Sequence, residues 1–221
     1  GVEGAHGGVR AVTRLRILGK ASSINVRKVL WTCAEIGLDY RREDWGSGFA
    51  STRDPAFLVL NPNALVPVVE DDNGALWESN TICRYLAAEH GRTDLLPATP
   101  RARAEVECWM DWQATALNGA WRHGFMGLVR RDPAFADPAG IAASLRDWAA
   151  MWAILDGQLG MTGAHVAGTG FTLADVVLGL SWNRWLMTPV EARPAFPAID
   201  AWYDRLGPRR GFHAHCGNGV P

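Results

Sequence analysis

The feature that most constrains the fold is the stretch LVPVVEDDNGALWESN at residues 65–80. Two short apolar runs, 66–70 and 75–77, flank an Asn-Gly dipeptide, which is a strong signal for a tight hairpin turn. From Ser79 onward, apolar residues recur at the three-to-four-residue spacing of an amphipathic helix. We therefore predict a β-hairpin followed directly by a helix, within a sheet that the hairpin joins.

The residues before the hairpin predict a strand, a helix and a second strand. Residues 14–19 are apolar and β-prone, and the helix-start residues at 21–25 precede a helical pattern that ends at Gly37, as a C-cap glycine would. Residues 38–45 predict the second strand, and 47–60 predict a loop with one helical turn. The order β-α-β and then β-β-α predicts an α/β domain with one mixed sheet and helices on its faces.

The second half of the chain predicts helices alone. Helical patterns cover the segments 101–119, 142–159, 173–186 and 196–206. Segment 173–186 is almost wholly apolar, which predicts that it lies at the centre of the helical domain. The predicted organisation is a disordered tail at 1–13, an α/β domain at 14–92, a linker at 93–100 and an all-helical domain at 101–221.

Composition limits the classes of partner. The chain carries 22 basic and 23 acidic residues, a net charge of −1, which argues against nucleic acid or an anionic membrane as the main partner. No apolar run approaches the roughly 18 residues of a membrane helix, and the start of the sequence lacks the apolar core of a secretory signal. The four cysteines are scattered, which fits free thiols in a reducing compartment. We therefore expect a cytoplasmic protein. Because His213, His215 and Cys216 fit no standard zinc spacing, we expect no metal.

Pro67 interrupts a valine-rich strand, and two explanations are open. A proline cannot donate to a sheet ladder, so it is expected at the first position of a strand or on an edge strand. Alternatively, a cis Val66-Pro67 bond costs only about 0.5–1 kcal/mol relative to trans. It would turn the N–H and C=O groups of Val66 out of the sheet, where they can pair with an extended ligand as an added strand does.

Two helix starts carry polar residues suited to a charged ligand. Ser79 occupies an expected N-cap, where a helix N-terminus binds carboxylates, and Glu78 beside it can bind an ammonium group. Together they can hold the head of an α-amino acid. At the earlier helix start, a hydroxyl of Ser22 or Ser23, with Asn25 nearby, can donate to an anion such as a thiolate. For both starts the alternative is an ordinary N-cap.

Three segments carry a resemblance to a known family: SSINVRKVLWTCAEIGLDY, NPNALVPVVEDDNGALWESNTICRYLAAEHG and FTLADVVLG. They are similar to the soluble glutathione S-transferases, and the resemblance extends over about residues 15–212. It implies a thioredoxin-like N-terminal domain that binds glutathione as a co-substrate. It also implies a helical C-terminal domain that covers a small apolar electrophile, no prosthetic group, and a homodimer.

The resemblance implies roles for individual residues. Pro67 matches the family's cis-proline, and Val66 matches the residue whose backbone pairs with the cysteinyl part of glutathione. Glu78 and Ser79 match the pair that holds the γ-glutamyl group. The segment Thr172–Asp175 matches the family's capping box, which is structural.

The sulfur contact implied by the resemblance falls on the first helix start. Ser23 matches the residue that contacts the sulfur in the serine-type and related bacterial classes, and Asn25 matches an asparagine used by some bacterial members. Ser22 is the alternative if the alignment slips by one residue. Leu65 stands where the family often has Lys or Gln, so the contact to the glycyl carboxylate is expected from Arg53 or is absent.

The apolar substrate site is expected on the first long helix of the second domain. The candidates are Trp109, Trp112, Trp121, His123 and Phe125, and the alternative is that most of them belong to the core or to a dimer interface. We predict a glutathione S-transferase that activates the glutathione thiolate for attack on an apolar electrophile. Two other functions are open: glutathione-dependent disulfide reduction, and a non-catalytic glutathione-binding or structural module.

Overall fold

The first half of the described chain forms a four-stranded mixed sheet with three helices. The structure, a computed structural model, describes residues 14–221, and the tail expected at 1–13 lies outside the described residues. The elements are β1 (Arg16–Leu18), α1 (Ile24–Ile36), β2 (Arg41–Glu43), α2 (Pro55–Leu58), β3 (Val68–Asp71), β4 (Gly74–Trp77) and α3 (Ser79–Glu89). The strand order is β2-β1-β3-β4, with β1 parallel to β2 and β3 antiparallel to both β1 and β4. The predicted mixed sheet and hairpin are confirmed.

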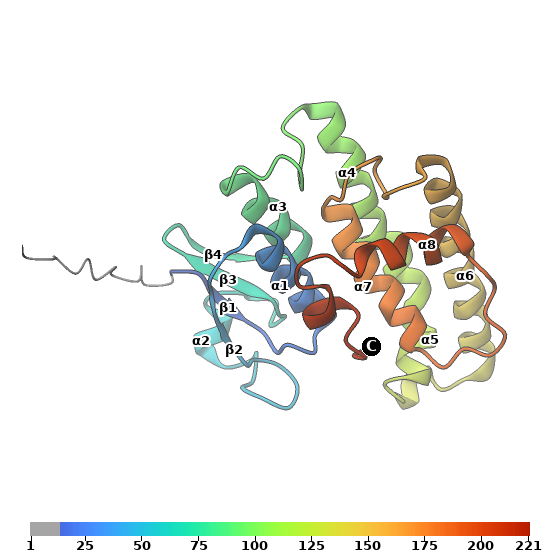
Figure 1. The fold of residues 1–221 in the computed structure, drawn as a ribbon. Helices are drawn as coiled ribbons and strands as arrows, with labels where there is room; N and C mark the ends of the chain where they lie inside the picture. Colours follow the sequence, from blue (N-terminus) through green and yellow to red (C-terminus); the bar gives the residue numbers. More distant parts are fainter. Residues whose placement is uncertain (1–13) are drawn as a thin grey trace, which may run out of the picture.

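Side chains of the sheet alternate between its two faces, as the geometry of a strand requires. Ile17 and Val69 belong to the main core, whereas Leu18 and Val68 pack with Phe57 of α2 in a separate cluster. Figure 1 shows α1 and α3 on the side of the sheet turned toward the C-terminal helices. Because α1 also packs against α7, this face of the sheet joins the two halves of the molecule.

Helix α1 begins and ends where the sequence predicts. At its start, the Ser23 hydroxyl accepts a hydrogen bond from the N–H of Val26 at 3.4 Å. At its end, Gly37 has φ 82° and donates its N–H to the carbonyl of Cys33 at 2.8 Å. A glycine takes this left-handed conformation without steric cost, so it stops the helix.

The second half is helical throughout. Its elements are α4 (Pro100–Trp112), the π-helix η1 (Gln113–Leu117), α5 (Asn118–Leu128), the short 3-10 helix η2 (Pro133–Phe135), α6 (Pro138–Thr162), α7 (Leu173–Met187), α8 (Pro197–Leu206) and the π-helix η3 (Phe212–Cys216). The helix predicted at 101–119 therefore continues through a π segment to Leu128. The sequence pattern does not reveal this widened turn, whose polar residue Gln113 is buried against the first half of the chain.

Helix α7 lies at the centre of the helical half, as its apolar sequence predicts. The predicted capping box at its start is confirmed. The Thr172 side chain accepts a hydrogen bond from the backbone N–H of Asp175, and the Asp175 side chain accepts one from the backbone N–H of Thr172. Asp175 is fully buried and also accepts hydrogen bonds from the Val166 N–H and the Trp202 indole, at 3.1 Å and 2.7 Å. Helix α7 packs against α4 on one side and α1 on another, so it links the helices to the sheet.

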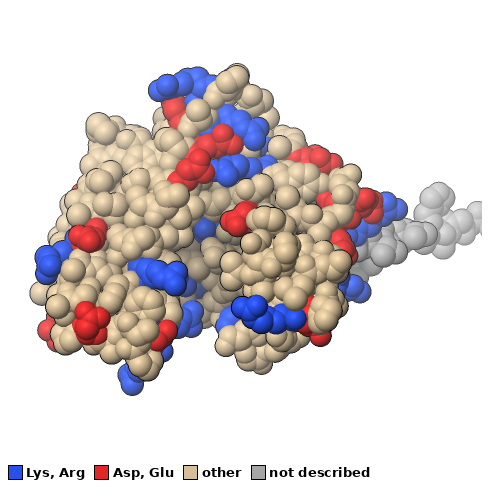
Figure 2. Space-filling view, turned by 180° about the vertical axis from the view of Figure 1, so that it is seen from behind, with Lys and Arg blue, Asp and Glu red and all other residues tan. Residues whose placement is uncertain are grey.

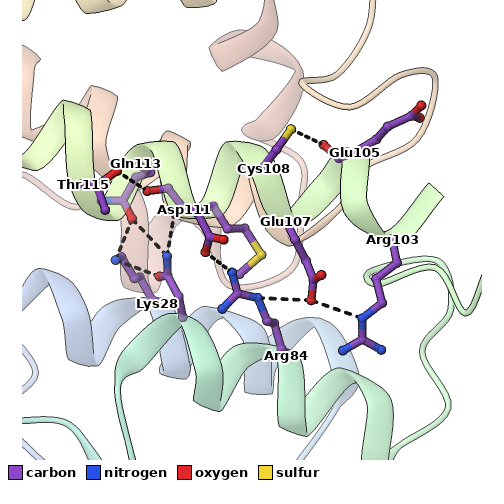
Figure 3. A network of polar contacts seen from close by, with 11 residues as sticks. Lys28, Arg84, Arg103, Glu105, Glu107, Cys108, Asp111, Gln113 and Thr115 are labelled. Atoms are coloured by element: carbon purple, nitrogen blue, oxygen red, sulfur yellow. Dashed lines mark hydrogen bonds and ion pairs between the residues drawn. The ribbon is translucent and has the colours of Figure 1, made fainter. Parts of the chain in front are cut away.

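A buried polar network ties the two halves together. The ammonium group of Lys28 on α1 donates to Asn80 Oδ1 of α3 at 2.9 Å and to Gln113 Oε1 of η1 at 2.8 Å. Figure 3 shows Lys28 pointing at Gln113, with Arg84 of α3 reaching Glu107 and Asp111 of α4 alongside. Burial lowers the pKa of Lys28 to about 8, which is still above neutral pH. At neutral pH the network therefore holds a cation at the contact of α1, α3 and η1.

The segment 93–100 is more than a connection. Leu95 and Leu96 are buried in the main core, and the carbonyl of Leu95 accepts a hydrogen bond from the N–H of Leu173 at the start of α7.

Among residues 14–221, none of the helices is long and apolar enough to cross a membrane.

Candidate active site

The peptide bond between Val66 and Pro67 is cis, as the second explanation of the sequence requires. The ladder between β1 and β3 begins only at Val68, which pairs with Leu18, so Val66 lies beyond it. Within residues 14–221, neither the N–H nor the C=O of Val66 has a hydrogen-bond partner. Its backbone groups are therefore available to an extended ligand.

A small cavity of about 70 Å³ adjoins this bend. It is lined by Asn25, Asn61, Asn63, Leu65, Val66, Pro67, Glu78 and Ser79. The hydroxyl of Ser79 donates to Asn25 Oδ1 at 3.4 Å, which connects the first turns of α1 and α3. The structure thus brings together the four residues predicted for a γ-glutamylcysteinyl group, namely Val66, Pro67, Glu78 and Ser79.

The expectation that Ser79 is the N-cap of α3 is wrong. Glu78 occupies the cap with φ 74° and ψ 108°, and its side chain caps nothing, while Ser79 is the first helical residue. The physical reason is that the Ser79 hydroxyl turns to Asn25 instead of to its own helix. The first turn of α3 consequently has no side-chain cap, which is the state in which a helix start binds an anion. A positive φ at a glutamate is strained, and such strain is often found at functional sites.

A larger cavity of about 490 Å³ lies between the sheet domain and the helices α5 and α7. Its walls from the first half are Lys20, Ser23, Ile24, Asn25, Gly46, Ser47, Thr52, Ala64, Leu65 and Val66; those from the second half are Trp121, Phe125, Met126, Arg130 and Arg184. Figure 2 shows the molecule hollowed between its two halves, with Lys and Arg atoms at the margin of the hollow. Asn25, Leu65 and Val66 line both cavities, so the two cavities meet there.

The three candidates for the sulfur contact are placed differently. Ser23 and Asn25 both line the larger cavity, whereas Ser22 is exposed and lines neither cavity. The Ser23 oxygen accepts from Val26, which leaves its O–H available to donate into the cavity. The Asn25 oxygen accepts from Ser79, so its NH₂ group is likewise available.

The aromatic candidates divide in the same way. Trp121 and Phe125 line the larger cavity from α5. Trp109 and Trp112 stand edge-to-face with ring centroids 5.2 Å apart and pack on the core, outside this cavity. His123 also lies outside it and pairs with Asp137 at 2.7 Å. The two candidates that reach the cavity, Trp121 and Phe125, both lie on α5 after the π segment.

Sequence reasoning missed the cations of the larger cavity. Arg53 is exposed and lines neither cavity, while Lys20, Arg130 and Arg184 line the larger one. The available signal was Arg184, because it is the one basic residue of the mostly apolar segment 173–186. A charged residue in a buried helix indicates a specific role. Within the described residues, no cluster of three or more His, Cys, Asp or Glu side chains is arranged to hold a metal ion.

Comparisons with known proteins agree with this architecture. Residues 13–88 match the family described as Glutathione S-transferase, N-terminal domain, and residues 131–209 match Glutathione S-transferase, C-terminal domain. Glutathione S-transferase GstB of Escherichia coli K12 is 38% identical over 197 residues, which are 88% of this chain and 94% of that protein. Glutathione S-transferase 3 of Zea mays is 31% identical over 210 residues, covering 90% of this chain and 91% of that one.

A solved structure extends the agreement to three dimensions. The theta-class glutathione S-transferase of Xanthomonas axonopodis pv. citri, with glutathione bound, is 37% identical and has a TM-score of 0.85, covering 93% of this chain and 98% of that chain. The confirmed sheet topology, the cis bond before β3 and the capping box of α7 accompany these matches. The chain belongs to the glutathione S-transferase family.

Proposed function

We propose that the chain is a glutathione transferase whose two adjoining cavities hold its two substrates. The smaller cavity takes the γ-glutamyl end of glutathione, and the larger one takes an apolar electrophile. The observation that supports this proposal is the wall of Asn25, Leu65 and Val66 that the two cavities share, because a thiol bound beside that wall would lie between the two substrates. The family membership and the glutathione bound to the Xanthomonas relative support the choice of ligand.

Glutathione is held by groups with matching charge. Glu78 accepts hydrogen bonds from the ammonium group, and the uncapped N–H groups of α3, beginning with the backbone N–H of Ser79, donate to the α-carboxylate. The unpaired backbone of Val66 pairs with the cysteinyl residue as an added strand would. For the glycyl carboxylate, Arg53 is the candidate from the sequence, and it adjoins Thr52 in the wall of the larger cavity.

Ser23 and Asn25 activate the thiol by donating to its anion. A free thiol with a pKa of about 8.5 is mostly protonated at neutral pH, and lowering its pKa by about two units requires about 2.7 kcal/mol. One hydrogen bond to a charged group contributes roughly 1.5–3 kcal/mol, and the start of α1 adds some tenths to about one through its dipole. The hydroxyl of Ser23 at the N-cap is thus sufficient in magnitude.

The test is the pKa of the bound thiol, read from the ultraviolet absorbance of the thiolate. We expect Ser23→Ala to raise that pKa by about one to two units, because one charge-assisted hydrogen bond is lost. Turnover should then fall about tenfold to hundredfold at neutral pH and recover in alkaline buffer. Ser23→Thr is the matched control, since it keeps both the hydroxyl and the helix cap.

Two outcomes would change the assignment. If Ser23→Ala leaves the pKa unchanged and Asn25→Ala raises it, the amide of Asn25 is the donor. If neither variant moves the pKa while glutathione still binds, both assignments are wrong.

The other functions considered from the sequence are not favoured. The Escherichia coli and Zea mays relatives are both named as transferases. If the chain is a disulfide reductase, it should turn over a mixed glutathione disulfide and conjugate nothing. If it is non-catalytic, it should bind glutathione without turning over either substrate. Assaying a chloronitrobenzene and a mixed disulfide side by side separates all three.

The assembly and the cellular compartment belong to the same proposal. We expect a cytoplasmic homodimer, as the family resemblance implies, with domains at 14–92 and 101–221. On the sheet half, Phe49 is 56% exposed and Val59 is 81% exposed. Exposed apolar side chains of this kind support a contact with a second subunit at this surface. Light scattering after gel filtration tests the dimer, and Phe49→Ser should shift it to monomer.

A further inference from the structure

A buried arginine without a partner stands in the wall of the larger cavity. Arg184 of α7 is only 4% exposed, yet within residues 14–221 its guanidinium group has neither an ion-pair partner nor a hydrogen-bond acceptor. A buried charge is costly unless it is paired. The cation is therefore explained best by a group that is present only when ligand is bound.

The guanidinium group packs against two aromatic rings. It lies 4.0 Å from the ring centroid of Phe125 and 4.6 Å from that of Trp121, both within the range of cation–π contacts. These ring contacts leave the N–H donors of Arg184 without a hydrogen-bond acceptor among residues 14–221. Because all three residues line the cavity, the donors are available to a ligand that rests on the same rings.

The charge around the cavity favours an anion. Among the described residues that line it, Lys20, Arg130 and Arg184 are cationic and none is acidic. Burial, and then the like charges of Arg130 and Arg27, lower the pKa of Arg184 to about 9. The Lys20 ammonium is partly satisfied, since it donates to the Ser47 carbonyl at 3.2 Å. Arg184 is thus the group with most to gain from a carboxylate, which an arginine binds through two parallel hydrogen bonds.

We propose that the larger cavity selects electrophiles that combine an apolar ring or chain with an anionic group, and that Arg184 binds this anion. The inference rests on the proposed function and names its substrate class. In the reaction, the glutathione thiolate forms a C–S bond at the electrophilic carbon while the bond to a halide breaks, and the halide leaves with the electron pair. The anion remains on the product and stays paired with Arg184.

The test compares a chlorodinitrobenzoate with its uncharged carboxamide, each corrected for its uncatalysed rate. We expect kcat/KM to favour the benzoate. In Arg184→Met that preference should fall by about tenfold to hundredfold, the factor expected for one charge-assisted interaction. The loss should appear mainly in KM of the benzoate. Arg122→Met on α5 is the matched control, because Arg122 is exposed and lies outside the cavity, and it should leave the preference unchanged.

Each result has one meaning. If the wild-type enzyme conjugates neither compound, the proposed function fails; if it conjugates the carboxamide but shows no preference for the benzoate, only the anionic site fails. If Arg184→Met weakens glutathione binding instead of the preference, Arg184 serves the glutathione carboxylate and the inference is overturned. Should Arg184→Met not fold, inhibition of the wild-type enzyme by benzenesulfonate decides. Inhibition competitive with the electrophile supports the site, and inhibition competitive with glutathione refutes it.

Discussion

Replacing Glu78 by glycine should stabilise the protein while weakening glutathione binding. Glu78 has φ 74°, a region that costs a residue with a Cβ about 1–2 kcal/mol. Glycine avoids that cost but loses about 0.5–1 kcal/mol more conformational entropy on folding. The net gain is about 0.5–1 kcal/mol, or a rise of about 1–4 °C in Tm for a chain of this size. Against this, the lost contact between an exposed carboxylate and the ammonium group is worth about 1 kcal/mol, or about fivefold in Kd.

Two further variants separate backbone strain from charge. Glu78→Gln keeps the side chain and the strained backbone, so it should lose the same glutathione affinity without any gain in Tm. Ala192→Gly removes a positive φ of 47° in the exposed loop between α7 and α8, so it should raise Tm without affecting glutathione. Thermal unfolding and isothermal titration measure the two effects. If Glu78→Gly and Glu78→Gln both bind glutathione as the wild type does, Glu78 does not hold the ammonium group and the reasoning fails.

Three other substitutions test the supports of the site. Lys28 has its pKa lowered from 10.5 to about 8, so the unfolded chain binds more protons between these values. The free energy of unfolding should rise with pH in that window by an amount on the order of 3 kcal/mol, and Lys28→Met should remove this contribution in urea titrations. Gly19→Ala would set a Cβ 2.4 Å from Val26 of α1 at φ 153°, so it should cost about 1–3 kcal/mol and lower turnover. Gly74→Ala, with a positive φ but open space around it, is its control in the same assays. Asp175→Ala should cost about 3 kcal/mol or more in the same unfolding assay, because it leaves several buried N–H groups unpaired; a loss below about 1 kcal/mol would contradict this account.

The features that the sequence predicted correctly are those determined by a few adjacent residues. The hairpin was predicted correctly, although its two turn residues are Asp72 and Asn73 and Gly74 already belongs to β4. The glycine that ends α1 and the Thr172–Asp175 capping box each satisfy backbone groups within one or two turns. Such local features can be predicted from sequence because the residue types involved strongly favour one backbone conformation at these positions. The cis bond at Pro67 was one of two explanations, and the tripeptide alone did not choose between them.

The features that the sequence did not predict depend on contacts between distant segments. Ser79 looks like a cap in isolation, but a partner on α1 draws its hydroxyl away. Gln113 looks like part of an ordinary helix, but it belongs to a π segment bonded to Lys28. Arg184 looks out of place in a mostly apolar helix, and the cavity that it lines is visible only in the structure. The spacing of apolar residues in a sequence indicates which face of a helix is buried, but it does not indicate which segment packs against that face.

The buried network and the site share the same helix turns, and this explains why the chain tolerates a buried lysine. Asn80 binds Lys28, and the residue before it, Ser79, donates to Asn25, one turn ahead of Lys28 on α1. The two bonds therefore clamp the first turn of α3 to the first turn of α1, one from the core side and one from the cavity side. An apolar residue at position 28 would pack without the cost of a buried charge, but it would remove the inner bond. The 3.4 Å bond of Ser79 would then be the remaining hydrogen bond between the proposed thiol donors on α1 and the proposed amino-acid site on α3, beside the apolar packing of the two helices. We therefore expect the Lys28 bonds to help set the relative position of α1 and α3, although burying the cation itself opposes folding.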